Sequence, residues 1–155
     1  MRVAEAAVAQ GDVLLASIGL GSCVAIVLYD PAVQVGGLAH VLLPSASMAR
    51  DRTNRAKFPA SAVPLLVEQM RALGAYERRM EARLVGGASM FTSLVPAGNL
   101  QIGERNVIAS RAALAQARIP IVCEEAGGGF GRSVYFYLAD GRVEVRSVAK
   151  GHVVI

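Results

Sequence analysis

The sequence predicts a mixed α+β domain, and three observations lead to this fold class. The chain has 155 residues, which is close to the usual size of one domain. Hydrophobic residues make up 54% of it and charged residues 18%, a composition that excludes a disordered chain. Strand-like runs come first, followed by a helix, a strand, a second helix and three strands, which is not a regular βαβ succession. We therefore expect residues 1–155 to form a single folded unit.

The first expected elements are strands. Residues 12–17 and 23–29 are apolar runs separated by a glycine-rich turn, and a third run covers residues 34–42. Asp30 and Pro31 open a turn between the second and third runs, because Asp is favoured at the first position of a turn and Pro at the next. These two runs are therefore expected to pair as a hairpin.

Helices and further strands are expected in the rest of the chain. The helices cover residues 59–73 and 103–117, and the strands cover residues 82–88, 119–125, 133–139 and 142–148. Gly74 stands where the cap of the first helix is expected. Asp140 and Gly141 form a hairpin turn into the last strand, which alternates apolar and charged residues as a half-exposed strand should.

Composition and patterning exclude several classes of protein. The net charge is only +4, no run of five or six basic residues occurs, and aromatic residues are few, which argues against a nucleic-acid surface. The uncharged residues 13–29 barely reach the roughly 17 residues of a membrane-spanning helix, and Gly19, Gly21 and Ser22 interrupt them. The preceding segment lacks the positive start of a signal peptide. We expect a cytoplasmic protein without nucleic-acid partners or membrane insertion.

No cofactor is indicated. Each of the two glycine clusters precedes a strand, whereas a nucleotide-binding loop must open a helix. Cys23 and Cys123 are too few for a disulfide framework. Together with His40 and His152 they also lack the close pairs that structural zinc sites use. Neither a metal nor an organic cofactor is therefore expected.

The predicted hairpin brings Cys23 and His40 together. If residues 30–33 form the connection, Tyr29 pairs with Gln34 and Cys23 lies directly opposite His40, on the same face of the sheet. A thiol and an imidazole so placed suit the thiolate–imidazolium pair of a cysteine hydrolase, with the thiol pKa well below its usual value of about 8.5. Backbone N–H groups of the preceding glycine turn would serve as an oxyanion hole.

The same residues also have structural interpretations. A cysteine in an apolar strand is often a small buried hydrophobic residue, and a strand histidine is often a hydrogen-bonded core residue. A register slip of one residue would place Cys23 and His40 on opposite faces. Cys123 lies in the apolar run IPIVC and is expected in the core, while His152 is expected at the surface or at an edge.

Several motifs occur together along the chain. They are IGLGSCVAIVLYDP followed by VGGLAHVLLP, then LVGGASMF, IGERN, and GGGFGRSVYF before a hairpin. From about residue 10 to residue 148 the chain thereby resembles the CheD family, the chemoreceptor glutamine deamidases of bacterial and archaeal chemotaxis. The resemblance implies an α+β fold with two packed mixed β-sheets flanked by helices (α/β/β/α), similar to the toxin-type cysteine glutamine deamidases.

The resemblance also implies catalytic residues. The family's nucleophile falls on Cys23 and its general base on His40, in a protein-glutamine glutaminase that forms a thioester and releases ammonia without a cofactor. The family's third catalytic residue is a Thr six positions before the nucleophile, where this chain has Ser17. Serine keeps the hydroxyl that can orient the imidazole, but its χ1 angle is less restricted than that of threonine.

Partners follow from the same resemblance. They are the cytoplasmic domains of chemoreceptors, whose Gln side chains would be converted to Glu, and a CheC-type phosphatase of the response regulator. Two alternatives stay open at this point. One is a non-enzymatic adaptor that binds these partners with an idle Cys23, and the other is a cysteine hydrolase that acts on a different amide or ester.

Overall fold

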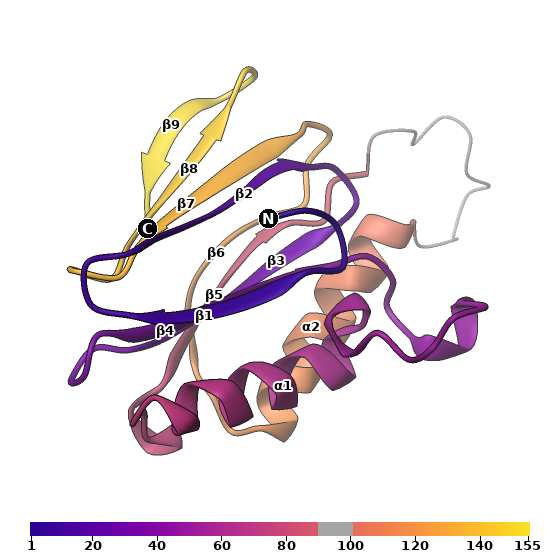
Figure 1. Ribbon diagram of the computed structural model, residues 1–155. Coiled ribbons are helices and arrows are strands. Elements are labelled where there is room, and N and C mark those ends of the chain that lie inside the picture. The colour runs from indigo at the N-terminus through magenta and orange to yellow at the C-terminus, as the bar shows by residue number, and fades with distance from the viewer. Residues whose placement is uncertain (90–100) are drawn as a thin grey trace.

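In the computed structural model, which describes residues 1–89 and 101–155, two β-sheets pack face to face and two α-helices cover one of them (Figure 1). The strands are β1 (Ala6–Gln10), β2 (Leu14–Leu20), β3 (Val24–Asp30), β4 (Val35–Val41), β5 (Glu81–Gly86), β6 (Ile121–Ala126), β7 (Arg132–Tyr137), β8 (Arg142–Ser147) and β9 (Gly151–Val154). The helices are α1 (Pro59–Ala72) and α2 (Ile102–Gln116), with short 3₁₀ turns η1 (Ala46–Met48), η2 (Arg55–Lys57) and η3 (Glu77–Arg79). Met90 and Phe91, which end the LVGGASMF motif, lie outside the described residues.

The two sheets differ in strand direction. The five-stranded sheet has the order β1-β4-β3-β5-β6 and is mixed, because β5 and β6 run parallel while its other pairs are antiparallel. The four-stranded sheet has the order β2-β7-β8-β9 and is antiparallel throughout. The described helices do not meet the length and hydropathy that crossing a membrane requires, and the uncharged residues 13–29 contribute to β2 and β3.

Both cores involve β3, the centre of the five-stranded sheet. Side chains alternate along a strand, so Val24, Ile26 and Leu28 pack against the two helices. Ala25 and Val27 face the four-stranded sheet instead. Because both faces are covered, every residue of β3 is buried, and the continuous apolar run that predicted this strand is explained.

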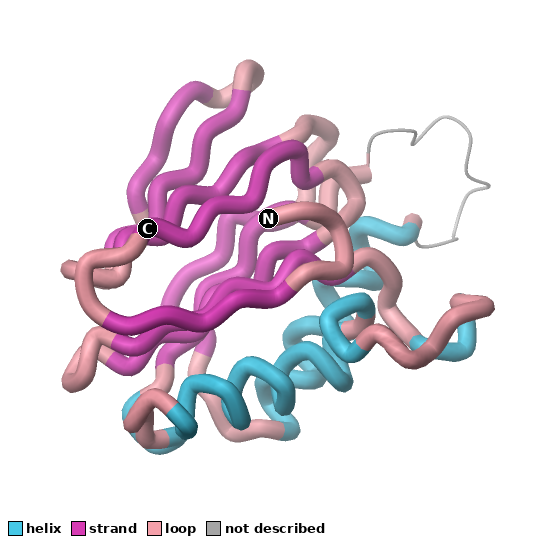
Figure 2. The backbone as a smooth tube through the Cα atoms, viewed as in Figure 1, coloured by secondary structure: helices cyan, strands magenta, loops and turns pink. Residues whose placement is uncertain are grey.

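The predicted α/β/β/α arrangement is wrong in one layer. Both α-helices lie on the outer face of the five-stranded sheet (Figure 2), and no helix among the described residues covers the outer face of the four-stranded sheet. That face is polar: Arg142 stacks 4.3 Å from the ring centre of Tyr137, and Arg146 stacks 4.4 Å from that of Tyr135. Since these tyrosine rings are already covered by guanidinium groups, the face needs no helix against it.

The two predicted helices and seven predicted strands are present, with shifted ends. Strands β1 and β9 have no counterpart in the prediction, because β1 is a short alanine-rich edge strand and all four residues of β9 are exposed. Strand β2 continues to Leu20 through an irregularity after Ser17, so the predicted glycine turn is shorter and covers only residues 21–23.

The β3–β4 hairpin closes one residue later than predicted. Asp30 belongs to β3 and pairs with Val35, so the four-residue turn covers residues 31–34 instead of 30–33. Gln34 ends the turn in the left-handed region, with φ at 51°. Every predicted pair is therefore displaced by two residues, and because side chains alternate with period two, each keeps its predicted face.

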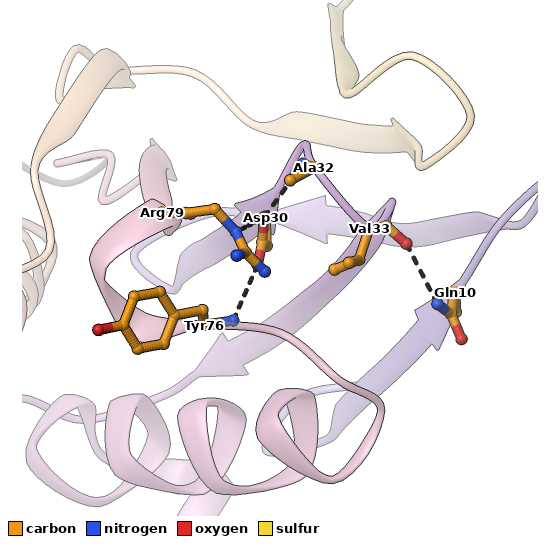
Figure 3. A network of polar contacts seen from close by, with 6 residues as sticks. All are labelled: Gln10, Asp30, Ala32, Val33, Tyr76 and Arg79. Atoms are coloured by element: carbon orange, nitrogen blue, oxygen red, sulfur yellow. Dashed lines mark hydrogen bonds and ion pairs between the residues drawn. The ribbon is translucent and has the colours of Figure 1, made fainter.

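The side chain of Asp30 explains why the turn starts late (Figure 3). It is fully buried and accepts hydrogen bonds from the N–H groups of Ala32 and Tyr76, at 3.1 and 2.8 Å, and from Nε of Arg79 at 3.0 Å. Burial raises the pKa of Asp30, but these hydrogen bonds outweigh it and hold the pKa below its usual value. The network fixes Asp30 in the strand and with it the register of the hairpin.

Candidate active site

Ser17, Cys23 and His40 come together between the two sheets. His40 lies on β4 and pairs with Ala25 of β3, so Cys23, two residues before Ala25, is its diagonal neighbour on the same face. The predicted direct opposition is therefore wrong, while the shared face is confirmed. Diagonal neighbours typically lie about 7–8 Å apart, within reach of an imidazole ring. All three residues are buried.

The imidazole of His40 is held from the opposite sheet. Oγ of Ser17, on β2, lies 2.8 Å from Nδ1 of His40 in a buried hydrogen bond. The backbone of His40 is also fixed, because its N–H donates to the carbonyl of Glu5 and its carbonyl accepts from the N–H of Ala4. The ring orientation thus depends on the packing of the two sheets against each other.

The second ring nitrogen of His40 has a different environment. Nε2 is buried and has no hydrogen-bond partner among the described residues, and that part of the chain contains no hydrogen bond between His40 and Cys23. Because Ser17 occupies Nδ1, Nε2 is the ring atom left to exchange a proton with a thiol. An unsatisfied buried nitrogen costs free energy, so its presence here has to be explained.

Burial shifts the two titrating groups away from the predicted ion pair. It raises the pKa of the Cys23 thiol, against a smaller opposing effect of that residue's own N–H. Burial also lowers the pKa of His40; the charged amino group of Met1 adds to this shift and Glu5 opposes it. Both directions disfavour the predicted thiolate–imidazolium pair, because the space between the sheets penalises both charged forms.

The turn before Cys23 is anchored through its carbonyl groups. The carbonyl of Cys23 accepts from the N–H of Gly87 at 2.8 Å, and that of Gly21 accepts from Ala88 at 2.9 Å. Gly86 has a φ of +108°, and a Cβ atom there would collide with the Cys23 carbonyl oxygen. The GGA motif is thus glycine-rich because the backbone of this segment lies directly against the turn at residues 21–23.

Asn106 of α2 completes the anchoring. Its Nδ2 donates to the carbonyl of Ser22 at 2.8 Å and to that of Leu42 at 3.0 Å, which ties the turn to the end of β4. Asn106 is fully buried and was not among the predicted site residues. The signal that could have identified it is the IGERN motif, since an asparagine on the buried face of a helix needs hydrogen-bond partners.

The N–H groups of the turn are less engaged than its carbonyls. Within residues 1–89 and 101–155, the backbone N–H groups of Ser22 and Cys23 donate to no other residue. Neighbouring N–H groups at a turn beside a nucleophile can stabilise a developing oxyanion. The arrangement thus offers a thiol, a proton acceptor and two backbone donors in one place.

The other cysteine and histidine lie elsewhere. Cys123 was expected in the core but is only half-buried, because β6 is an edge strand of the five-stranded sheet. His152 is exposed on the edge strand β9, as predicted, and its Nε2 lies 3.4 Å from the carboxylate of Glu144. Neither contributes to the Cys23 site.

Comparisons with known proteins agree with these motifs. A family model described as "CheD chemotactic sensory transduction" matches residues 42–147. A probable chemoreceptor glutamine deamidase CheD of Caldanaerobacter subterraneus is 44% identical over 149 residues, which is 96% of this chain and 92% of that protein. A second such protein, of Geobacter metallireducens, is 46% identical, covering 94% and 91% of the two chains. One of Pyrococcus abyssi is 41% identical, covering 98% and 93%. The alignments with these relatives span nearly the whole chain.

Proposed function

The chain belongs to the CheD family, and we propose on that basis that it is a chemoreceptor glutamine deamidase with Cys23 as nucleophile. The relatives that it matches over most of its length are named for this activity. The observation that carries the catalytic assignment is the hydrogen bond between Oγ of Ser17 and Nδ1 of His40, which leaves Nε2 open on the face that Cys23 shares. Residues 1–155 form one deamidase domain in this proposal.

The first step is attack on the side-chain carboxamide of a substrate glutamine. Sγ of Cys23 forms a bond to the carboxamide carbon while Nε2 of His40 takes the thiol proton. Burial raises the pKa of Cys23 and lowers that of His40, which favours proton transfer during the attack over proton transfer before it. The carbonyl oxygen becomes an oxyanion, to which the N–H groups of Ser22 and Cys23 donate.

The second step releases ammonia. The imidazolium of His40 gives its proton to the amide nitrogen, the carbon–nitrogen bond breaks, and a glutamyl thioester remains on Cys23. His40 then takes a proton from water, whose oxygen attacks the thioester carbon. The carbon–sulfur bond breaks, the thiolate recovers the proton, and the substrate residue is now glutamate. The balance is one water consumed and one ammonia released, with no cofactor.

Ser17 acts as a positioning residue in this scheme. Nδ1–H of His40 donates to Oγ of Ser17, which keeps the proton on Nδ1 and leaves Nε2 as an acceptor. The 2.8 Å contact spans the two sheets, so the substitution of serine for the family's threonine keeps the bond that the mechanism needs. What serine lacks is the restriction of χ1 that β-branching imposes.

The proposed partners are proteins of the chemotaxis system in the cytoplasm. The substrates are glutamines on the cytoplasmic domains of chemoreceptors, in line with the names of the relatives. A CheC-type phosphatase is a second proposed partner, carried over from the family resemblance. A net charge of +4 suits an acidic substrate surface.

Incubation with purified receptor cytoplasmic domains tests the proposal. Peptide mass spectrometry should detect Gln-to-Glu conversion at defined positions, together with ammonia release, and Cys23→Ala should show neither. Binding without conversion by the wild-type protein would favour the adaptor, and cleavage of the receptor chain would favour a hydrolase of another bond. Either result would overturn the deamidase assignment.

A further inference from the structure

We propose that an open groove beside the Cys23 turn binds a carboxylate of the substrate protein, and that Arg132 is the residue that selects it. The inference rests on the proposed deamidase function and adds a specificity determinant to it. The groove has a volume of about 780 Å³ and lies where β2 ends and β7 begins. Its lining includes Gly19, Phe130, Gly131, Arg132, Tyr135 and Arg146.

Strand β2 connects the groove to the candidate active site. Gly19 lies on β2 between Ser17 and Cys23, and Arg132 pairs with Leu20, which precedes the turn at residues 21–23. Leu20 packs in the same core cluster as Cys23. The groove and Cys23 therefore lie at the same end of the molecule, the groove toward the outer face of the four-stranded sheet and the thiol between the two sheets.

Arg132 is a buried cation with few partners. It is only 4% exposed, yet its Nε has no hydrogen-bond partner among the described residues. The carboxylate of Glu125 is 4.0 Å from that atom, and Nη1 makes a long contact of 3.5 Å with the carbonyl of Phe130. A guanidinium has five N–H donors, and buried charges are normally paired. The position therefore calls for an acceptor that arrives with a ligand.

Arg79 provides a comparison, because its guanidinium is paired with a carboxylate. Its Nε and Nη2 both contact the carboxylate of Asp30, at 3.0 and 2.9 Å, although its side chain is 42% exposed. Arg132 is far more buried and has no such fork. Its guanidinium stacks instead on the ring of Phe130, 4.1 Å from the ring centre, which holds it in place for a planar anion such as a carboxylate.

The charge of the groove selects the same class of ligand. None of the described residues that line it is acidic, and two of them are arginines. Arg146 is paired with Glu144 at 2.8 Å, so Arg132 contributes most of the uncompensated positive charge. Lys150 adds a further cation 6.0 Å from the ring centre of Phe130. A cationic or neutral segment gains nothing here.

Sheet geometry sets how far the carboxylate stands from the glutamine. Glu125, which Arg132 approaches, lies in the row of paired residues that runs through Val85 and Ala25 to His40. Neighbouring strands lie about 4.8 Å apart, so Glu125 is about 10 Å from Ala25 on β3. Arg132 thus approaches a residue two strand spacings from the β3 partner of His40, and we place the acidic residue that it binds at a comparable distance from the reacting glutamine.

The test measures deamidation of receptor cytoplasmic domains by Arg132→Gln and Arg132→Lys. We expect Arg132→Gln to raise KM about tenfold with kcat changed less than threefold, and Arg132→Lys to raise KM less. Arg142→Gln, which removes an exposed arginine of the same sheet outside the groove, should leave both constants unchanged. Arg132→Glu should regain affinity for a receptor whose acidic residues near the glutamine are replaced by Lys.

Two outcomes separate this inference from the proposed function. If wild-type protein converts glutamine and folded Arg132→Gln has the same KM, or loses affinity equally for receptors with and without the nearby acidic residues, Arg132 is only structural. If wild-type protein converts no glutamine, the function fails, and the groove is tested by receptor binding alone. In that measurement Arg132→Gln should weaken binding of the acidic receptor and not of the neutralised one, and equal binding would overturn the inference. Thermal unfolding identifies variants that do not fold.

Discussion

The two ends of the β3–β4 hairpin both bury polar side chains, but only one end satisfies them. At the turn, the carboxylate of Asp30 accepts from two backbone N–H groups and from Arg79. At the open end, His40 makes one side-chain hydrogen bond, to Ser17, and its Nε2 has none within the described chain. The difference indicates that the fully hydrogen-bonded carboxylate of Asp30 holds the register, whereas Nε2 of His40, which has no such partner, remains available to accept a proton.

Among substitutions at the open end of the hairpin, His40→Ala should reduce the rate of deamidation most. We expect it to reduce deamidation nearly as much as Cys23→Ala, because the thiol then has no proton acceptor. The double variant should be no slower than either single variant, since residues that act as a unit give non-additive losses. Ammonia release by the three folded variants measures this. A double variant that is far slower than both singles would show that the two residues act separately.

The protonation state of the open end should be visible in thiol labelling. Burial raises the pKa of Cys23 above the ordinary value of a thiol and lowers that of His40 below the ordinary value of an imidazole. Iodoacetamide should therefore label Cys23 slowly at neutral pH, with a rate that rises only at alkaline pH. Deamidase kcat/KM should show a broad plateau between the two pKa values. Rapid labelling of Cys23 at pH 6 to 7 would indicate a thiolate–imidazolium pair and would contradict a neutral thiol and imidazole.

Substitutions at Ser17 should have smaller, graded effects. Ser17→Ala removes the oxygen at Nδ1 of His40 and should lower kcat about tenfold or more, with little change in KM. Ser17→Thr keeps the hydroxyl and restricts χ1, so activity should be kept or raised. Steady-state assays that determine kcat and KM separately for the two variants check both expectations. If the Thr variant is as inactive as the Ala variant while both are folded, the positioning role is wrong.

At the turn end, Asp30→Asn should affect stability and leave the chemistry alone. We expect a loss of about 1–3 kcal/mol in the free energy of unfolding, the usual effect of leaving a buried hydrogen-bonding group without its partner, and an unchanged kcat. The folded pKa of Asp30 is depressed, so its contribution is present above the unfolded pKa of about 3.9 and is lost as pH falls through the folded value. Denaturant unfolding between pH 2 and 7 measures this; a pH dependence equal to that of the wild type would contradict the network's role.

The hairpin also shows how far sequence reasoning reaches here. Side-chain alternation placed Cys23 and His40 on one face correctly, because a turn displaced by one residue along the chain does not change faces. The local sequence does not predict the exact register, because Asp30 is held by Tyr76 and Arg79, which are 46 and 49 residues away. The pKa directions likewise depend on burial between two sheets, which no local pattern reveals.

Residues that act across layers were the hardest to predict. Asn106 anchors the turn before Cys23 from a helix 84 residues from Ser22, and nothing in its local sequence specifies that contact. Ser17 was reached through the family resemblance alone, because its hydrogen bond to His40 joins two different sheets. Alternating apolar and polar residues in the sequence indicate that one face of the four-stranded sheet is polar. The prediction of helices on both sides did not take this polar face into account.

The most direct test is to trap the acyl intermediate. Wild-type protein mixed with a receptor cytoplasmic domain, quenched in acid within the first turnovers and digested, should yield a Cys23 peptide joined by a thioester to a receptor glutamine-derived peptide. Hydroxylamine should cleave this adduct, and Cys23→Ala should give none. An adduct on Cys123, or rapid ammonia release by Cys23→Ala, would contradict the assignment of Cys23 as the nucleophile.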